Sequence, residues 1–230
     1  MRKVALLVAT MLLPGCNMIV SEAPWFGVED IRGAPALRDG VWAVMLSADC
    51  AFDDALPSEQ WPDCAEPMVV RGNQLLNQQW TSRLGANDAI EREFLLWEEQ
   101  RILLVGGDPL ILQMEKTPQA LLMDEKPTEV PVETPWSYVA VRPLAHDAGG
   151  RITALERWVV SCGPIPPRRK GEESSPHVTD RPYPGLRVVG DNCRADSQEA
   201  VRQAARLTEQ DDRALGVAPL PARWVRDGWR

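Results

Sequence analysis

Five cysteines, two histidines and 33 carboxylates are the side chains of this 230-residue chain that could do chemistry. A serine or cysteine nucleophile needs a base within reach, which is usually a histidine. The only histidines are His146, which precedes Asp147, and His177. Because neighbouring side chains at a turn point apart, we interpret both histidines as surface residues. The sequence therefore predicts no catalytic nucleophile.

Carboxylates are a second route to catalysis, and several of them gather between residues 47 and 66. Calcium-binding loops need Asp at alternating positions, a central Gly and a late Glu, and the spacing here is different. A glycosidase needs two carboxylates facing each other across a cleft, which a sequence does not reveal. We interpret the stretch as a solvated acidic loop, with a carboxylate-dependent hydrolase as the alternative. Its carboxylates are Asp49, Asp53, Asp54, Glu59 and Asp63.

Cys16 differs from the other cysteines in what precedes it. Positive charges at residues 2–3 come before an uncharged apolar run over residues 4–13, which is too short to span a bilayer. A basic head, an apolar run and a small residue at the cut, here Gly15, are the parts of a secretory signal. With Leu13 three positions before Cys16, this end resembles the bacterial lipobox. An ordinary signal with a chance cysteine is the alternative.

The lipobox resemblance implies an organisation and a location. Residues 1–15 would be a signal peptide, residues 16–38 a lipid-anchored tether, and residues 39–230 a single β-rich domain. Cys16 would carry the lipid. Taken whole, the chain resembles uncharacterised envelope lipoproteins of Gram-negative bacteria, which implies a membrane partner and no particular chemistry. Asn17 follows the cysteine, and by resemblance to enteric sorting this favours the outer membrane, with the domain facing the periplasm.

If Cys16 is lipidated, four cysteines remain, and an even number in an exported chain predicts two disulfides. Three connectivities are open, and pairing of sequence neighbours is the simplest. We therefore predict Cys50 bonded to Cys64 and Cys162 bonded to Cys193. Zinc knuckles need cysteines about two to four residues apart, which neither pair satisfies. We expect no metal site and no cofactor.

The net charge of −8 limits the partners further. Nucleic-acid phosphate repels an acidic chain, which also gains nothing from counterion release. We therefore expect no nucleic-acid partner. The remaining partners are the membrane, an apolar small ligand and another envelope protein.

The elements that must position these side chains are mostly strands. Turn residues such as Gly72-Asn73 join apolar or alternating runs, which is typical of antiparallel hairpins. In one strand, alternation would place Ile152, Trp158 and Cys162 on the same face. The predicted strands and hairpins are residues 41–46, 67–71 with 74–76, 101–105 with 110–115, 136–143 with 151–162, 186–189 and 222–226.

Other segments have different signals. Asp196 and Glu199 have capping-box spacing at the start of an amphipathic pattern, which predicts a helix over residues 196–215. Residues 87–100 favour a short helix that runs into extended chain. Two proline-rich stretches, residues 116–135 and 163–184, predict long surface loops.

Nine tryptophans are the unusual feature of the composition. Tryptophan stacks on sugars and also fills cores and interface hot spots. Trp42, Trp136 and Trp158 lie within predicted strands, so we expect them to be among the most buried residues. Core packing and contact with an apolar ligand both remain open for these three.

Gly40-Val41-Trp42 opens the first predicted strand, and hairpins, a late helix and a final strand follow. This order resembles the lipocalin layout, of which the stretch from Thr179 to Tyr183 carries a distorted second motif. We predict a mainly β protein: an antiparallel meander or open barrel, with one C-terminal helix packed on it and long proline-rich loops. The expected function is a non-catalytic binding or envelope-assembly module, and the alternative is a carboxylate-dependent envelope hydrolase.

Overall fold

The computed structural model describes residues 17–84, 90–115, 119–123, 126–130, 136–164 and 178–228. For residues 79–84, 90–97, 119–123 and 126–130 the description covers the backbone alone. Cys16, the predicted signal peptide over residues 1–15 and His177 lie outside the described residues.

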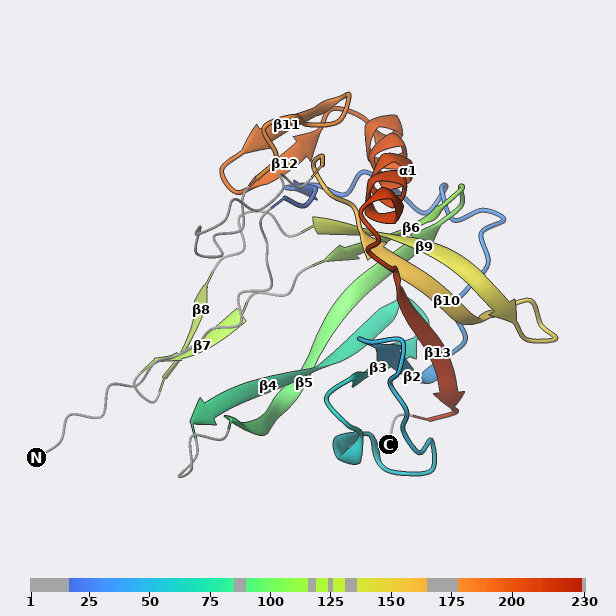
Figure 1. Cartoon of the computed structure of the whole chain (residues 1–230), viewed down its shortest axis with the longest axis vertical. Coiled ribbons are helices and arrows are strands. Elements are labelled where there is room, and N and C mark those ends of the chain that lie inside the picture. The colour runs from blue at the N-terminus through green and yellow to red at the C-terminus, as the bar shows by residue number, and fades with distance from the viewer. Residues whose placement is uncertain are drawn as a thin grey trace, which may run out of the picture.

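Strands dominate the described residues, as the sequence predicts, and the one α-helix among them lies near the C-terminus (Figure 1). Within the described residues, no helix is long and apolar enough to cross a membrane. The elements are β1 (Val20–Ser21), β2 (Gly40–Met45), the 3-10 helix η1 (Ser58–Gln60), β3 (Ala65–Arg71), β4 (Gln74–Leu84), β5 (Ile90–Val105), β6 (Leu110–Glu115), β7 (Gln119–Met123), β8 (Lys126–Val130), β9 (Trp136–His146), β10 (Ile152–Val159), β11 (Leu186–Val189), β12 (Asn192–Ala195), α1 (Gln198–Ala214) and β13 (Leu220–Arg226).

Eight strands form a closed antiparallel barrel in the order β9, β10, β13, β2, β3, β4, β5 and β6, and β6 pairs back onto β9. Cross-strand partners at the closure include Leu112 with Val139. Closure removes both sheet edges, so the backbone groups of the outer strands find partners within the barrel. The prediction of a mainly β fold with one packed helix is confirmed. The barrel is closed, whereas the sequence left a meander or an open barrel as alternatives.

The barrel interior is one buried cluster made almost entirely of strand side chains. Trp42 is fully buried within it, opposite Met68 on the neighbouring strand, and its indole Nε1 donates to the carbonyl of Arg38 at 2.8 Å. The interior is therefore a packed core. Its largest described side chains include Trp42, Met68, Leu75, Ile102, Leu112, Ile152 and Leu155.

Two further layers cover parts of the outer surface of the barrel. On one side, α1 and the segment before β2 pack on β9 and β10. On the other side, the loop after β2 folds back over β2 and β3 and buries Val41, Val69 and Trp61. β2 is consequently buried on both faces, which explains why its sequence is apolar throughout rather than alternating.

A bulge in β10 changes which residues share a face. The pairing of β10 with β9 shifts between Ile152 and Leu155. Ile152 and Leu155 point into the barrel, whereas Trp158 and Cys162 pack outside it under α1. The prediction that Ile152 and Trp158 share one face is wrong, because one extra residue in a strand reverses the alternation beyond it.

Three local predictions also fail. Residues 90–105 form one strand without a helix, because pairing with β4 and β6 outweighs the local helical pattern. Residues 119–130, predicted as part of a surface loop, contain the antiparallel hairpin of β7 and β8. Ser197 is the N-cap of α1 in place of Asp196: its hydroxyl accepts from the amide of Ala200 at 3.1 Å.

The predicted tether is the largest correction. The sequence predicts a tether over residues 16–38, but residues 17–38 belong to the folded domain. Ile19 is fully buried, and Phe26 and Leu37 are also buried. The pair Trp25-Phe26 packs on the core of the protein itself.

Candidate functional site

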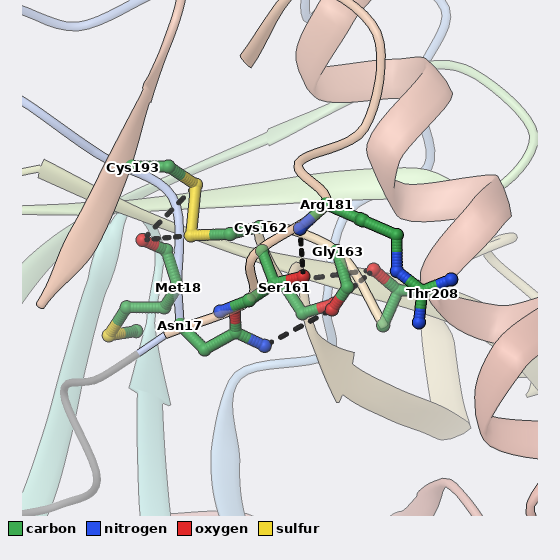
Figure 2. Close-up of a disulfide and its surroundings, with 9 residues drawn as sticks. Asn17, Met18, Ser161, Cys162, Gly163, Arg181, Cys193 and Thr208 are labelled. Carbon is green, nitrogen blue, oxygen red and sulfur yellow. Dashed lines mark hydrogen bonds between the residues drawn. A yellow bond between two sulfur atoms is a disulfide. The ribbon is translucent and has the colours of Figure 1, made fainter. Parts of the chain in front are cut away.

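The first described residue, Asn17, is already held by the folded domain. Its backbone N–H donates to the carbonyl of Asp191 at 2.7 Å, and its carbonyl accepts from the amide of Cys162 at 2.9 Å. Its side-chain amide donates to the carbonyl of Gly163 at 3.2 Å (Figure 2) and accepts from the amide of Thr179 at 3.1 Å. Four hydrogen bonds to four residues therefore fasten the chain one position after Cys16.

The Cys162–Cys193 disulfide lies directly against the next residue, Met18. Met18 pairs with Ser161 in a short antiparallel bridge, and Ile19 pairs with Cys193 in a parallel one. The carbonyl oxygen of Met18 accepts from the amide of Cys193 at 3.1 Å and lies 3.5 and 3.7 Å from the two sulfurs (Figure 2). A disulfide sulfur has no hydrogen to donate, so these two approaches are packing contacts. The N-terminal segment thus runs between the two chain segments that the disulfide joins.

The contacts that hold the N-terminal segment to the domain continue into β1. Val20 and Ser21 pair with the start of β9, and the Ser21 hydroxyl lies 2.6 Å from the hydroxyl of Tyr138. Burial raises the pKa of Tyr138. Further along, the amide of Phe26 donates to the side chain of Gln113 at 2.9 Å, and Gln113 donates back to the Phe26 carbonyl at 3.0 Å. We call residues 17–26 the anchor segment.

The helix α1 covers the barrel beside the anchor segment. The small residues of α1 let the helix lie close to the barrel. The indole of Trp158 donates to the carbonyl of Ala205 in the helix at 3.0 Å. The Thr208 hydroxyl lies 3.0 Å from that of Ser161, the residue that pairs with Met18 (Figure 2). The helix therefore supports the strand end on which the anchor segment rests.

Both predicted disulfide pairs are present. Cys50 is bonded to Cys64 with a Cα–Cα separation of 5.6 Å, and Cys162 to Cys193 with one of 5.7 Å. The two disulfides lie in different layers, because the first closes the acidic loop and the second braces the anchor segment.

The three tryptophans of the predicted ligand site do not come together. Trp42 lies inside the barrel, whereas Trp158 lies outside it under α1. Both are buried, as predicted. Trp136 is only partly buried at the start of β9, so the expectation that it ranks among the most buried residues is wrong. These positions indicate three packing roles and no shared surface for one ligand.

The acidic loop is built around an ion pair. Arg223 of β13 donates to Asp54 at 2.8 Å, and its guanidinium lies 4.8 Å from the ring centre of Phe52. The hydrogen bond from Arg223 holds the pKa of Asp54 below its ordinary value. A general acid needs a raised carboxyl pKa, so Asp54 is tuned in the opposite direction. A hollow of about 250 Å³ beside it is lined by Met45, Cys50, Phe52 and Arg223 among others, and the structure describes no carboxylate in its lining.

No protein-family model, curated protein or solved structure matches this chain. The anchor segment was predicted as a tether, although the apolar residues Ile19 and Val20, so close to Cys16, were a signal that the chain is buried there.

Proposed function

We propose that this chain is an envelope lipoprotein, acylated at Cys16, that holds a disulfide-braced barrel directly at a membrane surface. The observation that supports this most is the burial of Asn17, the residue next to Cys16. Asn17, the residue bonded to Cys16, is already part of the fold. A lipid on Cys16 would therefore attach the barrel to the bilayer without a flexible linker between them. The anchor segment would then hold the whole domain close to the membrane surface.

The location proposed is the periplasmic side of the outer membrane. Two disulfides support an oxidising compartment, since thiols stay reduced in the cytosol. Asn17 after the cysteine supports the outer membrane only by resemblance to enteric sorting.

The role proposed is a non-catalytic binding or assembly module. The packed interior around Trp42 favours a partner on the outer surface, such as an envelope protein, over an apolar ligand inside the barrel. The ion-paired state of Asp54 also disfavours the alternative of a carboxylate-dependent hydrolase.

Metabolic labelling with palmitate tests the proposal. Label should enter the wild-type chain and be absent from Cys16→Ser. The double variant Cys50→Ser/Cys64→Ser is the matched control, because it removes two cysteines and should keep the label. Equal labelling of wild type and Cys16→Ser would overturn the lipoprotein proposal.

A further inference from the structure

A hollow of about 220 Å³ lies between the anchor segment and the β11–β12 hairpin. Its walls include Glu22 and Trp25 from the anchor segment and Arg187 and Arg194 from the hairpin. Its volume is several times the ~30 Å³ that one water occupies in the liquid. The hollow opens only a few residues from the point where the chain is fastened.

The two arginines of the hairpin face each other. Arg187 and Arg194 are direct cross-strand partners, which places their side chains on one face of the hairpin. Like charges in that position repel unless an anion lies near them. Glu22 pairs with Arg194 at 2.7 Å, whereas Arg187 is exposed and has no ion-pair partner in the described part of the chain. One positive charge on this wall is left uncompensated, in a chain of net charge −8.

Two buried N–H donors of the wall residues also lack acceptors. The indole Nε1 of Trp25 and the Nε of Arg194 have no hydrogen-bond partner among the residues that the structure describes. Buried donors are nearly always satisfied by protein, water or ligand. Both of these N–H groups are shielded from solvent, so the donors that an oxyanion in the hollow would meet come from the unpaired Arg187 and from the rest of the Arg194 side chain.

We infer that this hollow binds a phosphate group, and that its source is the headgroup of an anionic phospholipid. A guanidinium matches phosphate oxygens in a two-pronged geometry, and two guanidinia from one hairpin can hold one phosphate from the same side. The choice of a lipid headgroup rests on the proposed function, because acylation at Cys16 would bring the hollow to the bilayer surface. Basic pockets near a membrane surface are suited to such headgroups.

Calorimetric titration of the purified full chain in neutral detergent tests the inference. The ligands are dihexanoyl phosphatidylglycerol, the phosphate-free dihexanoylglycerol and inorganic phosphate. We expect binding of the phospholipid and none of dihexanoylglycerol. Inorganic phosphate that binds as tightly as the phospholipid would identify the free ion as the ligand and overturn the headgroup assignment. Equal binding of both lipids would overturn the phosphate site itself.

Variants separate the site from general charge effects. Arg194→Gln and Arg187→Gln should each weaken phospholipid binding about fivefold, since one basic residue at an anionic surface contributes ~1 kcal/mol. Arg151→Gln is the matched control, because Arg151 is also paired with a carboxylate, Asp147 at 2.8 Å, but lies in the β9–β10 turn. It should leave binding unchanged. Glu22→Gln should strengthen binding, which a damaged fold could not do.

Phospholipid binding that responds equally to Arg194→Gln and Arg151→Gln would overturn the site. The titration does not require the acyl chain, whereas the labelling of Cys16 does not require the hollow. Failure of one proposal is therefore distinguishable from failure of the other.

Discussion

Asn17 occupies a position that few side chains could fill. Its φ of 74° lies in the left-handed region, where Asn is tolerated better than other non-glycine residues. Its amide group also bonds two distant segments, through Gly163 and Thr179. Backbone conformation and side-chain chemistry therefore select the same residue next to Cys16.

Substitutions at Asn17 should separate these two contributions. Asn17→Gly keeps the left-handed backbone but loses both side-chain hydrogen bonds and leaves buried partners unsatisfied, so unfolding free energy should fall by about 2–3 kcal/mol. Asn17→Ala should cost about 1 kcal/mol more, because Ala is strained at this φ. Urea unfolding measures both. Asn73→Gly, in the β3–β4 turn, is the control and should change stability by less than about 0.5 kcal/mol. Equal losses for Asn17→Gly and Asn73→Gly would contradict the role of Asn17.

Asp54 predicts a dependence of stability on pH. Arg223 lowers the pKa of Asp54 from its ordinary 3.8, so the folded state holds that proton less tightly than the unfolded state does. The ion pair therefore stabilises the fold fully above the unfolded pKa, and this contribution is lost as pH falls through the folded pKa. Asp54→Asn should be less stable than wild type at neutral pH, and the difference should shrink as pH falls below 3.8 and vanish once Asp54 is protonated in the folded state. Arg223→Gln should show the same profile in acid-unfolding curves. A difference that is constant across pH would refute the assignment.

At the scale of elements, the two disulfides have different tasks. Cys50–Cys64 closes the loop that covers β2 and β3, whereas Cys162–Cys193 joins the end of β10 to β12 across the anchor segment. The second disulfide therefore stabilises three chain segments at once, because the Met18 carbonyl packs against both of its sulfurs.

Removing each disulfide should reveal this difference. The bridges span sequence separations of 31 and 14 residues, so loop-closure entropy predicts losses of about 4 kcal/mol for Cys162→Ser/Cys193→Ser and about 3 kcal/mol for Cys50→Ser/Cys64→Ser. Limited proteolysis is the sharper measurement. New cleavage within residues 17–26 should appear in the first double variant and not in the second. Cleavage of that segment in both variants, or in neither, would show that the Cys162–Cys193 bridge does not brace it.

At the scale of the whole molecule, the barrel is a sheet covered on both faces over much of its circumference. Its interior is a packed core. α1 and the anchor segment cover one outer side, and the disulfide-closed loop covers another (Figure 1). β4 and β5 continue past their pairing with β3 and β6 as a two-stranded ribbon that projects from the barrel (Figure 1).

This architecture predicts unequal roles for tryptophans that look equivalent in the sequence. Trp42→Ala should cost about 3–5 kcal/mol of unfolding free energy, because it leaves a large cavity in the barrel interior. Trp136→Ala should cost clearly less, since the Trp136 side chain is only partly buried and its site can be refilled by water. Denaturant unfolding with both variants is the measurement. A loss for Trp136→Ala as large as that for Trp42→Ala would place the stabilising core outside the barrel.

Local signals in the sequence predicted the hairpins within residues 67–76, 101–115 and 136–162, the C-terminal helix and both disulfide pairs. Gly72-Asn73 could be identified as a turn from its two residues alone. Four cysteines allow only three disulfide connectivities, and pairing of sequence neighbours is the simplest of them. Residues 87–100 were ambiguous, because a helical pattern and an apolar strand core overlap there. Only the long-range pairing with β4 and β6 decided between them.

Tertiary structure alone decided three things: that the barrel closes, which face each β10 residue occupies, and that the chain is fastened from Asn17 onward. Closure depends on pairs such as Val44 with Ala222, far apart in sequence, and no local periodicity records them. The β10 bulge is a one-residue shift that alternation cannot reveal. The anchor segment is too short to show a period, and its stability comes from backbone and side-chain partners such as Gly163 and Asp191, which only the folded chain brings to it.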